Sequence, residues 1–302
     1  MPEYSVEQLL DHVNSSYSQP GNERVRKIAE SMIGHMYSVI VDFNVSHAEL
    51  WSLFTWINDL GTAKQAGLLG AGIGLERLLD ILADEADKQA HRAKGTPRAI
   101  EGPLYIPNAP LSKHEARLDD GSEKGEPLVM EGTVRDTQGK PVPHAIVDVW
   151  HAGQGGGYSF FDPSLQEFNY RRRIETDEKG HYLSHSLLPP GYAVPPGSPT
   201  QQLLDVLGRH GNRPAHIHFM ISGKNHVPLT TQVNIPGDEY LNDDFAFATR
   251  DALVVELHKI TDPKKIAQYR QNGPFTYIEF DFTLQVADKE LPTNRQAAPE
   301  QE

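Results

Sequence analysis

Residues 213–219 read Arg-Pro-Ala-His-Ile-His-Phe, which places two histidines two residues apart in a run of strand-forming residues. Neighbouring side chains of a β-strand point to opposite faces, so His216 and His218 should project from the same face. This spacing suits the chelation of a metal ion, although a single histidine on a strand is more often a hydrogen-bonded structural residue. The pair predicts a β-domain that carries a candidate metal site.

Two tyrosines follow turn-forming residues upstream of this segment. Tyr158 comes after three glycines, and Tyr192 comes after the sequence Pro-Pro-Gly. Such a tyrosine is more often a packed aromatic residue than a ligand, so either one alone is weak evidence. Together with the two imidazoles, the two phenols indicate ferric iron, which prefers hard donor atoms.

Composition excludes several classes of site and partner. The chain of 302 residues has no cysteine, which rules out disulfides, iron–sulfur clusters and zinc sites with thiolate ligands. A net charge of −13 argues against nucleic acid as a partner. No signal-type segment is found, and no apolar run approaches the roughly 18 residues that a membrane span requires. The sequence therefore predicts a soluble cytoplasmic protein with a small substrate and no membrane association.

Hydrophobic periodicity divides the chain into a helical and a β-rich part. Helical spacing predicts one helix over 22–43, a second after a capping box formed by Ser46 and Glu49, and a third from near Thr62 to the charged stretch 84–88. After Pro97, short β-rich runs alternate with turn residues. We expect an α+β fold with a helical N-terminal domain over 1–95, an all-β sandwich over 96–290 and a disordered tail over 291–302.

Three further segments allow more specific predictions. Strict alternation over 277–286 predicts one outer strand with a single buried face. The glycines of 70–74 resemble part of a dinucleotide-binding motif, but they lie in a helical pattern, so close helix packing explains them better. The neighbouring acids Asp243 and Asp244 should point apart and be solvated.

Four motifs connect the chain to a known family. They are Ile-Glu-Gly-Pro-Leu-Tyr at 100–105, Asp-Val-Trp-His-Ala at 148–152, Leu-Gly-Arg-His-Gly-Asn-Arg-Pro-Ala-His-Ile-His at 207–218 and Leu-Thr-Thr-Gln-Val-Asn at 229–234. Over nearly its whole length the chain resembles the intradiol ring-cleavage dioxygenases, and most closely their catechol-cleaving branch. The resemblance implies one mononuclear non-haem Fe(III) per chain, with Tyr158, Tyr192, His216 and His218 as its protein ligands.

The resemblance also implies an activity and the residues that serve it. The expected reaction is the cleavage of catechol by O2 to cis,cis-muconate, a step in the catabolism of aromatic hydrocarbons through the β-ketoadipate pathway. Arg213 would stabilise negative charge that develops on the ring, Tyr192 would leave the metal and accept a proton, and Gln232 would orient the metal site. The residues implied as walls of the substrate pocket are Leu68, Ala71, Ile100, Pro103, Leu104, Phe245 and Ala246.

Alternatives remain open for the substrate and for catalysis itself. Relatives that act on chlorocatechol or hydroxyquinol commonly have an aromatic residue after the Gly-Pro pair, so Leu104 favours unsubstituted catechol. A non-catalytic metal-binding β-sandwich, for example with zinc, is the other possibility, and the paired tyrosines argue against it. The resemblance further implies a homodimer formed through the N-terminal helices, with a phospholipid bound between them.

Overall fold

The protein is described by a computed structural model that covers residues 4–16 and 21–287. The chain divides into two compact units, residues 1–62 and residues 63–302. The tail predicted over 291–302 lies outside the described residues. The domain boundary predicted between residues 95 and 96 stays a prediction. The compact units are divided elsewhere, between Thr62 and Ala63.

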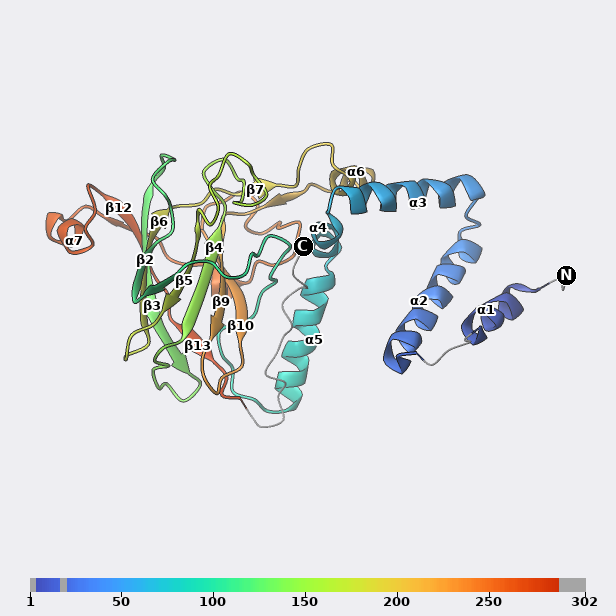
Figure 1. Cartoon of the computed structure of the whole chain (residues 1–302), viewed down its shortest axis with the longest axis horizontal. Coiled ribbons are helices and arrows are strands. Elements are labelled where there is room, and N and C mark those ends of the chain that lie inside the picture. The colour runs from blue at the N-terminus through green and yellow to red at the C-terminus, as the bar shows by residue number, and fades with distance from the viewer. Residues whose placement is uncertain (1–3, 17–20, 288–302) are drawn as a thin grey trace. The chain divides into compact units, whose positions relative to one another are not determined.

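The first unit consists of the helices α1 (Val6–Ser15), α2 (Glu23–Asp42) and α3 (His47–Thr62) (Figure 1). Asn22 caps α2 by accepting a hydrogen bond from the Val25 amide at 3.0 Å. The predicted capping box is present at the start of α3, where the Ser46 amide donates to Glu49 Oε2 at 2.8 Å and the Glu49 amide donates to Ser46 Oγ at 3.3 Å. Both helices predicted for this region are therefore confirmed.

The second unit begins with the helices α4 (Ala66–Gly72) and α5 (Leu75–Gln89). The prediction of one continuous helix from near Thr62 is wrong, because the chain breaks at Gly74, which has a φ of +77°. This left-handed conformation favours glycine and interrupts the helical hydrogen bonds. The glycines also serve close packing, as expected, since a Cβ on Gly72 would lie 2.9 Å from the Phe245 ring.

The strands of the second unit form two main sheets, drawn as neighbouring layers in Figure 1. The five-stranded sheet has the order β1 (Leu111–Lys113), β5 (Arg171–Glu175), β4 (Ile146–His151), β9 (His216–Ser222) and β10 (Leu229–Asn234). The six-stranded sheet has the order β11 (His258–Ile260), β12 (Phe275–Glu279), β3 (Pro127–Asp136), β6 (His181–Leu187) and β2 (Glu115–Arg117), with β13 (Phe282–Leu284) also paired to β3.

Smaller elements complete the second unit. The short strands β7 (Tyr192–Ala193) and β8 (Asn212–Arg213) pair with each other, with α6 (Pro199–Val206) between them in the sequence. A 3-10 helix, η1 (Asp251–Leu253), and the helix α7 (Pro263–Gln268) lie in the C-terminal part. No helix in 4–16 or 21–287 is long and apolar enough to cross a membrane.

One large apolar core joins the two sheets, so the prediction of a helical N-terminal region followed by a β-sandwich is confirmed. Strand β9 shows how the sandwich positions a site. Its odd-numbered residues Ile217, Phe219 and Ile221 belong to this core, and each is at most 2% exposed. His216 and His218 must therefore project from the opposite face of the strand.

The C-terminal segment differs from its prediction. It forms two strands, β12 and β13, and β12 lies between β11 and β3 in the sheet instead of at its edge. The interruption falls at Phe280 and Asp281, where Asp281 Oδ1 accepts the Thr133 amide at 2.7 Å. A Cβ on Gly132 would collide with the Phe280 carbonyl, so the glycine permits this close approach. Alternation of residue types carries no information about such a break.

Candidate active site

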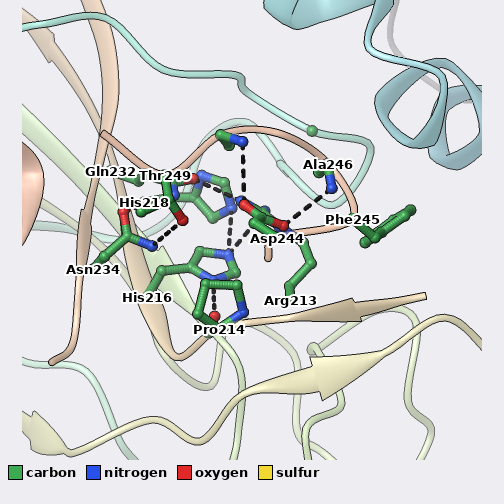
Figure 2. Close-up of polar contacts among 12 residues, drawn as sticks. Arg213, Pro214, His216, His218, Gln232, Asn234, Asp244, Phe245, Ala246 and Thr249 are labelled. Atoms are coloured by element: carbon green, nitrogen blue, oxygen red, sulfur yellow. Dashed lines mark hydrogen bonds and ion pairs between the residues drawn. The ribbon is translucent and has the colours of Figure 1, made fainter. Parts of the chain in front are cut away.

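The two histidines of β9 form the centre of the candidate site (Figure 2). Their Nε2 atoms are 3.1 Å apart, and both side chains are 2% exposed. His216 Nδ1 lies 2.6 Å from the Pro214 carbonyl, to which it donates its proton, so Nε2 is the ring nitrogen that carries the lone pair. The His218 ring stacks on Trp150 of the neighbouring strand β4, with ring centroids 4.9 Å apart and an angle of 2° between the planes.

The two tyrosines reach the same site from separate segments of the chain, Tyr158 from a loop and Tyr192 from β7. Their rings meet edge to face at 5.4 Å, and the Tyr192 ring lies 5.5 Å from the ring of His216. Tyr192 is placed by β7, which pairs with β8, and a Cβ on Gly156 would lie 3.0 Å from its side chain. Tyr158 is 3% exposed, and its hydroxyl has no hydrogen-bond partner within 4–16 and 21–287. The structure thus brings two phenols and two imidazoles together.

Burial sets the protonation of these groups. Desolvation, followed by the charge of Arg213, lowers the pKa of His216 to about 3, and desolvation holds the pKa of His218 well below its ordinary value. Both rings are therefore neutral near pH 7, which is the form that binds metal. Burial also raises the pKa of the Tyr158 phenol well above its usual range, with the neighbouring Tyr192 adding to this effect. A phenolate at Tyr158 consequently needs a cation close by.

Arg213 is buried beside the histidines and is not part of a surface salt bridge. It is 3% exposed, its Nη1 lies 3.0 Å from His216 Nε2, and its Nη2 donates to Gln232 Oε1 at 2.9 Å. Its other partner is Asp244, at 3.1 Å. Although burial opposes the charge, Asp244 raises the pKa of Arg213 above its ordinary value, so the guanidinium remains charged.

Gln232 connects Arg213 to the sheet that carries the histidines. It lies on β10 directly opposite His218 in the strand register. Its Oε1 accepts from Arg213, and its Nε2 donates to Asn234 Oδ1 at 3.1 Å. The side-chain amide is thus fixed at both ends, which suits the predicted orienting role.

The predicted pocket walls fall into three neighbouring groups. Leu104 packs with Tyr158 and Tyr192 in one apolar cluster. Pro103 lies against α4, where a Cβ on Gly67 would be 2.8 Å from it. The remaining five residues belong to a second apolar cluster, namely Leu68, Ala71, Ile100, Phe245 and Ala246.

Comparison with known proteins decides the family. The chain matches the family described as "Dioxygenase" over residues 100–286 and the one described as "Catechol dioxygenase N terminus" over residues 22–91. The chain belongs to the intradiol ring-cleavage dioxygenase family.

Relatives within this family cover nearly the whole chain. It is 46% identical to a catechol 1,2-dioxygenase of Acinetobacter guillouiae over 298 aligned residues. The alignment covers 98% of each sequence. The crystal structure of wild-type Acinetobacter radioresistens catechol 1,2-dioxygenase superimposes with a TM-score of 0.94 at 44% identity and covers 98% of this chain and 97% of that chain. A chlorocatechol 1,2-dioxygenase of Rhodococcus opacus is 32% identical and covers 87% of this chain and 98% of its own length.

The candidate ligands of this dioxygenase fit a ferric ion. Among the residues that the structure describes, no group of three or more His, Asp or Glu side chains could hold a metal. The two phenols lie beside the imidazoles and can add oxygen donors to them. The unpartnered, buried Tyr158 hydroxyl and the paired Nε2 atoms supply the hard oxygen and nitrogen donors that Fe(III) prefers.

Sequence reasoning missed two residues of this dioxygenase site. The prediction that Asp244 is solvated is wrong, because this residue is 7% exposed and paired with Arg213. The two neighbouring acids do point apart as expected, and Asp243 lies on the exposed side near His210. The family motif at 148–152 includes Trp150 but does not indicate that its ring stacks on His218. The largely apolar run Ala-Ile-Val-Asp-Val-Trp at 145–150 predicts a strand and was the available signal for Trp150, whereas the sequence around Asp244 gives none.

Proposed function

We propose that this chain cleaves catechol between its two hydroxylated carbons with O2, giving cis,cis-muconate, and that Tyr158, Tyr192, His216 and His218 hold the ferric ion required. The convergence of two neutral imidazoles and two phenols at one buried point carries this proposal. The relatives that share 44–46% identity over nearly the full chain are named catechol 1,2-dioxygenases, and this supports the activity.

The bound ferric ion supplies a hard Lewis acid that stabilises phenolate and catecholate oxygens. The two tyrosines differ in accessibility, since Tyr158 is 3% exposed and Tyr192 is only partly buried. Tyr192 is thus the phenol better placed to move aside and to accept a proton from the incoming catechol. Tyr158 remains enclosed by its neighbours as the permanent oxygen donor.

Arg213 provides the fixed positive charge of the site. Its guanidinium lies beside His216 and is buried, so its field is weakly screened where negative charge develops on the substrate ring. Gln232 holds the Nη2 end of the guanidinium and lies opposite His218, so it orients both the charge and the metal-binding strand. Around them, the apolar walls bind the flat ring by its faces and exclude water.

Unsubstituted catechol is the preferred substrate of this proposal. Leu104 packs beside both tyrosines, where an aromatic side chain would take space from the ring. The lower identity to the chlorocatechol enzyme, 32% against 46%, points in the same direction. Chlorocatechol or hydroxyquinol remains the alternative substrate, and the ratio of kcat/KM values for catechol and a chlorocatechol distinguishes these cases.

The helices of residues 1–62 support the inferred dimer. The structure describes all of α2, and no residue in it is buried; apolar side chains at helical spacing are 46% to 62% exposed, namely Val25, Ile28, Met32, Met36 and Val39. An apolar stripe of this size is unfavourable when it is exposed to water, so it indicates a surface that a partner covers. We infer that a second copy of the chain covers it, with a phospholipid between the copies, and that the dimer acts in the cytoplasm.

Replacing Tyr192 tests the proposal. The wild-type protein, loaded with iron, should consume O2 and catechol in equal amounts and form muconate, whereas Tyr192→Phe should lose most of this turnover. Tyr269→Phe is the control, because Tyr269 binds Glu131 in the other sheet, away from the site. Unchanged turnover of Tyr192→Phe would contradict the assignment of this ligand, and an inactive wild-type protein would contradict the function.

A further inference from the structure

We propose that Asp244 is a positioning residue which holds the guanidinium of Arg213 and the Phe245–Ala246 wall of the substrate pocket as one rigid unit. This inference rests on the proposed function, because Arg213 and the wall are assigned their roles there. Asp244 does not touch the reacting atoms in this account. It acts through the residues that do.

Every acceptor position of the Asp244 carboxylate is directed to Arg213 or to the backbone of residues 246–248, which follows the wall. Oδ1 accepts from Arg213 Nε at 3.1 Å and from the Ala246 amide at 3.1 Å. Oδ2 accepts from Arg213 Nη2 at 3.1 Å and from the Ala248 amide at 3.2 Å. A carboxylate has about four lone-pair directions, so all of its hydrogen-bonding capacity is used inside the site. Figure 2 shows the carboxylate between Arg213 and Ala246.

The bidentate contact fixes the plane of the guanidinium. Asp244 binds the Nε and Nη2 edge, and Gln232 adds a second contact to Nη2. Only Nη1 remains directed toward His216 and the metal ligands, 3.0 Å from Nε2. A planar guanidinium held on one edge by a two-point contact has little rotational freedom. The side of Arg213 presented to substrate is thus set by Asp244.

The same carboxylate folds the pocket wall. By accepting the amides of Ala246 and Ala248, it shapes the turn that follows Asp244, and the Phe245 amide is tied to the Asn212 carbonyl at 3.1 Å, one residue before Arg213. Phe245 then packs on Gly72 of α4. Displacement of the carboxylate should therefore move the positive charge and the wall together.

Asp243 offers a matched control in the same segment. Its side chain is 80% exposed and lies 3.1 Å from His210, whereas the Asp244 side chain is 2% exposed. Both replacements with asparagine remove one negative charge from adjacent positions. A general effect of charge or of local sequence would appear in both variants, while a positioning effect would appear only at Asp244.

The first test compares the kinetics of the iron-loaded variants. In Asp244→Asn only the amide oxygen can accept a hydrogen bond, so the two-point contact to Arg213 is lost. This variant should lower kcat on the order of 10- to 100-fold and raise KM, while the iron content stays at the wild-type level. The relative kcat/KM values for catechol and 4-methylcatechol should also change, because the wall moves. Asp243→Asn should stay within about twofold of wild type in all of these values. Values for Asp244→Asn within twofold of wild type would overturn the proposal.

A double-mutant cycle tests whether Asp244 acts through Arg213. With Arg213→Lys already in place, Asp244→Asn should cost much less than it does in the wild-type background, because the bidentate contact is already lost. Separate losses that multiply would overturn the coupling. If Asp244→Asn fails to fold, Asp244→Glu replaces it: this variant keeps the charge but displaces the carboxylate, and it should change the substrate ratio while retaining iron. Asp244→Glu with an unchanged substrate ratio would count against the proposal.

A measurement without turnover separates this inference from the proposed function. In the metal-free protein, the Nε–H of Arg213 should exchange slowly with solvent by NMR, and Asp244→Asn should accelerate this exchange at least about tenfold, because two charge-assisted bonds to the guanidinium are lost. Asp243→Asn should leave it unchanged. Equal exchange in all three proteins would overturn the positioning role even if the enzyme is active. Inactivity of wild-type protein would instead remove the proposed function and leave this result standing.

Discussion

The Nε2 atoms of His216 and His218 lie 3.1 Å apart on the face of β9 opposite to the apolar core of the sandwich. Two neutral imidazoles this close together place both Nε2 atoms beside one point in space. The strand geometry, the tautomer of His216 and the stacking of His218 on Trp150 together fix where that point lies.

Tyr158→Phe should remove an iron ligand while changing the stability of the metal-free protein by less than about 1 kcal/mol. The hydroxyl is buried without a hydrogen-bond partner within the described ranges, so its loss leaves no partner unsatisfied. Tyr182→Phe is the opposite case, because the Tyr182 hydroxyl donates to the Phe280 carbonyl at 2.8 Å. That variant should lose about 1–3 kcal/mol of unfolding free energy but keep the iron–tyrosinate absorption. Urea unfolding and the visible spectrum measure the two effects, and the reverse pattern would contradict the assignment.

Trp150→Phe should weaken iron binding on the order of 10- to 100-fold, since it loosens the orientation of His218. The smaller ring also leaves a cavity in a fully buried position, at a cost of about 1–3 kcal/mol in unfolding free energy. Trp51→Phe is the control, because Trp51 is 66% exposed on α3. Competition with a chelator measures the iron affinity. Equal affinities in the two variants would show that the stack does not support the metal site.

Asp148→Asn should raise the stability near neutral pH by up to about 3 kcal/mol. Burial raises the pKa of Asp148 to about 6, while the Tyr105 hydroxyl at 2.8 Å partly offsets this shift. An unfolded aspartate has a pKa of about 3.9, so between about pH 4 and pH 6 the folded state binds a proton that the unfolded state has lost. This group therefore makes the free energy of unfolding fall as the pH rises through that window.

The test is the difference in stability between Asp148→Asn and wild type as a function of pH. The asparagine oxygen still accepts from Tyr105, so the hydrogen bond should survive the change. We expect the variant's advantage in urea unfolding to be small near pH 4 and to grow up to about pH 6. An advantage that does not vary with pH would rule out the buried charge as its source.

Gly72→Ala should displace the Phe245 ring, because the added Cβ would lie 2.9 Å from it. The expected result is a raised KM for catechol and a loss of roughly 1–3 kcal/mol in stability from overpacking. Gly70→Ala lies in the same helix with no atom within 4 Å of the added Cβ, and it should stabilise the protein by about 0.5–1 kcal/mol without changing KM. Steady-state kinetics and thermal unfolding of the pair test this prediction. A normal KM for Gly72→Ala would remove Phe245 from the pocket wall.

The regular parts of the fold were predictable from local patterns. The capping box at Ser46 and Glu49 and the helix that begins at Glu23 are set by residues close in sequence, and the structure has both. The paired histidines follow from the two-residue period of a strand. The breaks were missed, because Gly74 in its left-handed conformation and the interruption at Phe280 depend on contacts with distant parts of the chain.

In the candidate site, too, some residues can be identified from local sequence and others only from contacts between distant parts of the chain. The four candidate ligands could be named from the family resemblance, and the two-residue spacing of His216 and His218 suggests a metal site without it. Asp244 could not be identified, because nothing in the sequence distinguishes its buried carboxylate from the exposed one of Asp243. The difference arises from Arg213, which is 31 residues away in the sequence and in contact only in the folded protein.

The visible spectrum of the purified, iron-loaded protein, recorded before and after anaerobic addition of catechol, tests the central claim most directly. Tyrosinates bound to Fe(III) should give a broad red-brown absorption, and the absorption should shift when catecholate binds. A colourless iron-loaded protein would contradict Tyr158 and Tyr192 as ligands. A coloured protein whose spectrum does not respond to catechol would contradict catechol as the substrate.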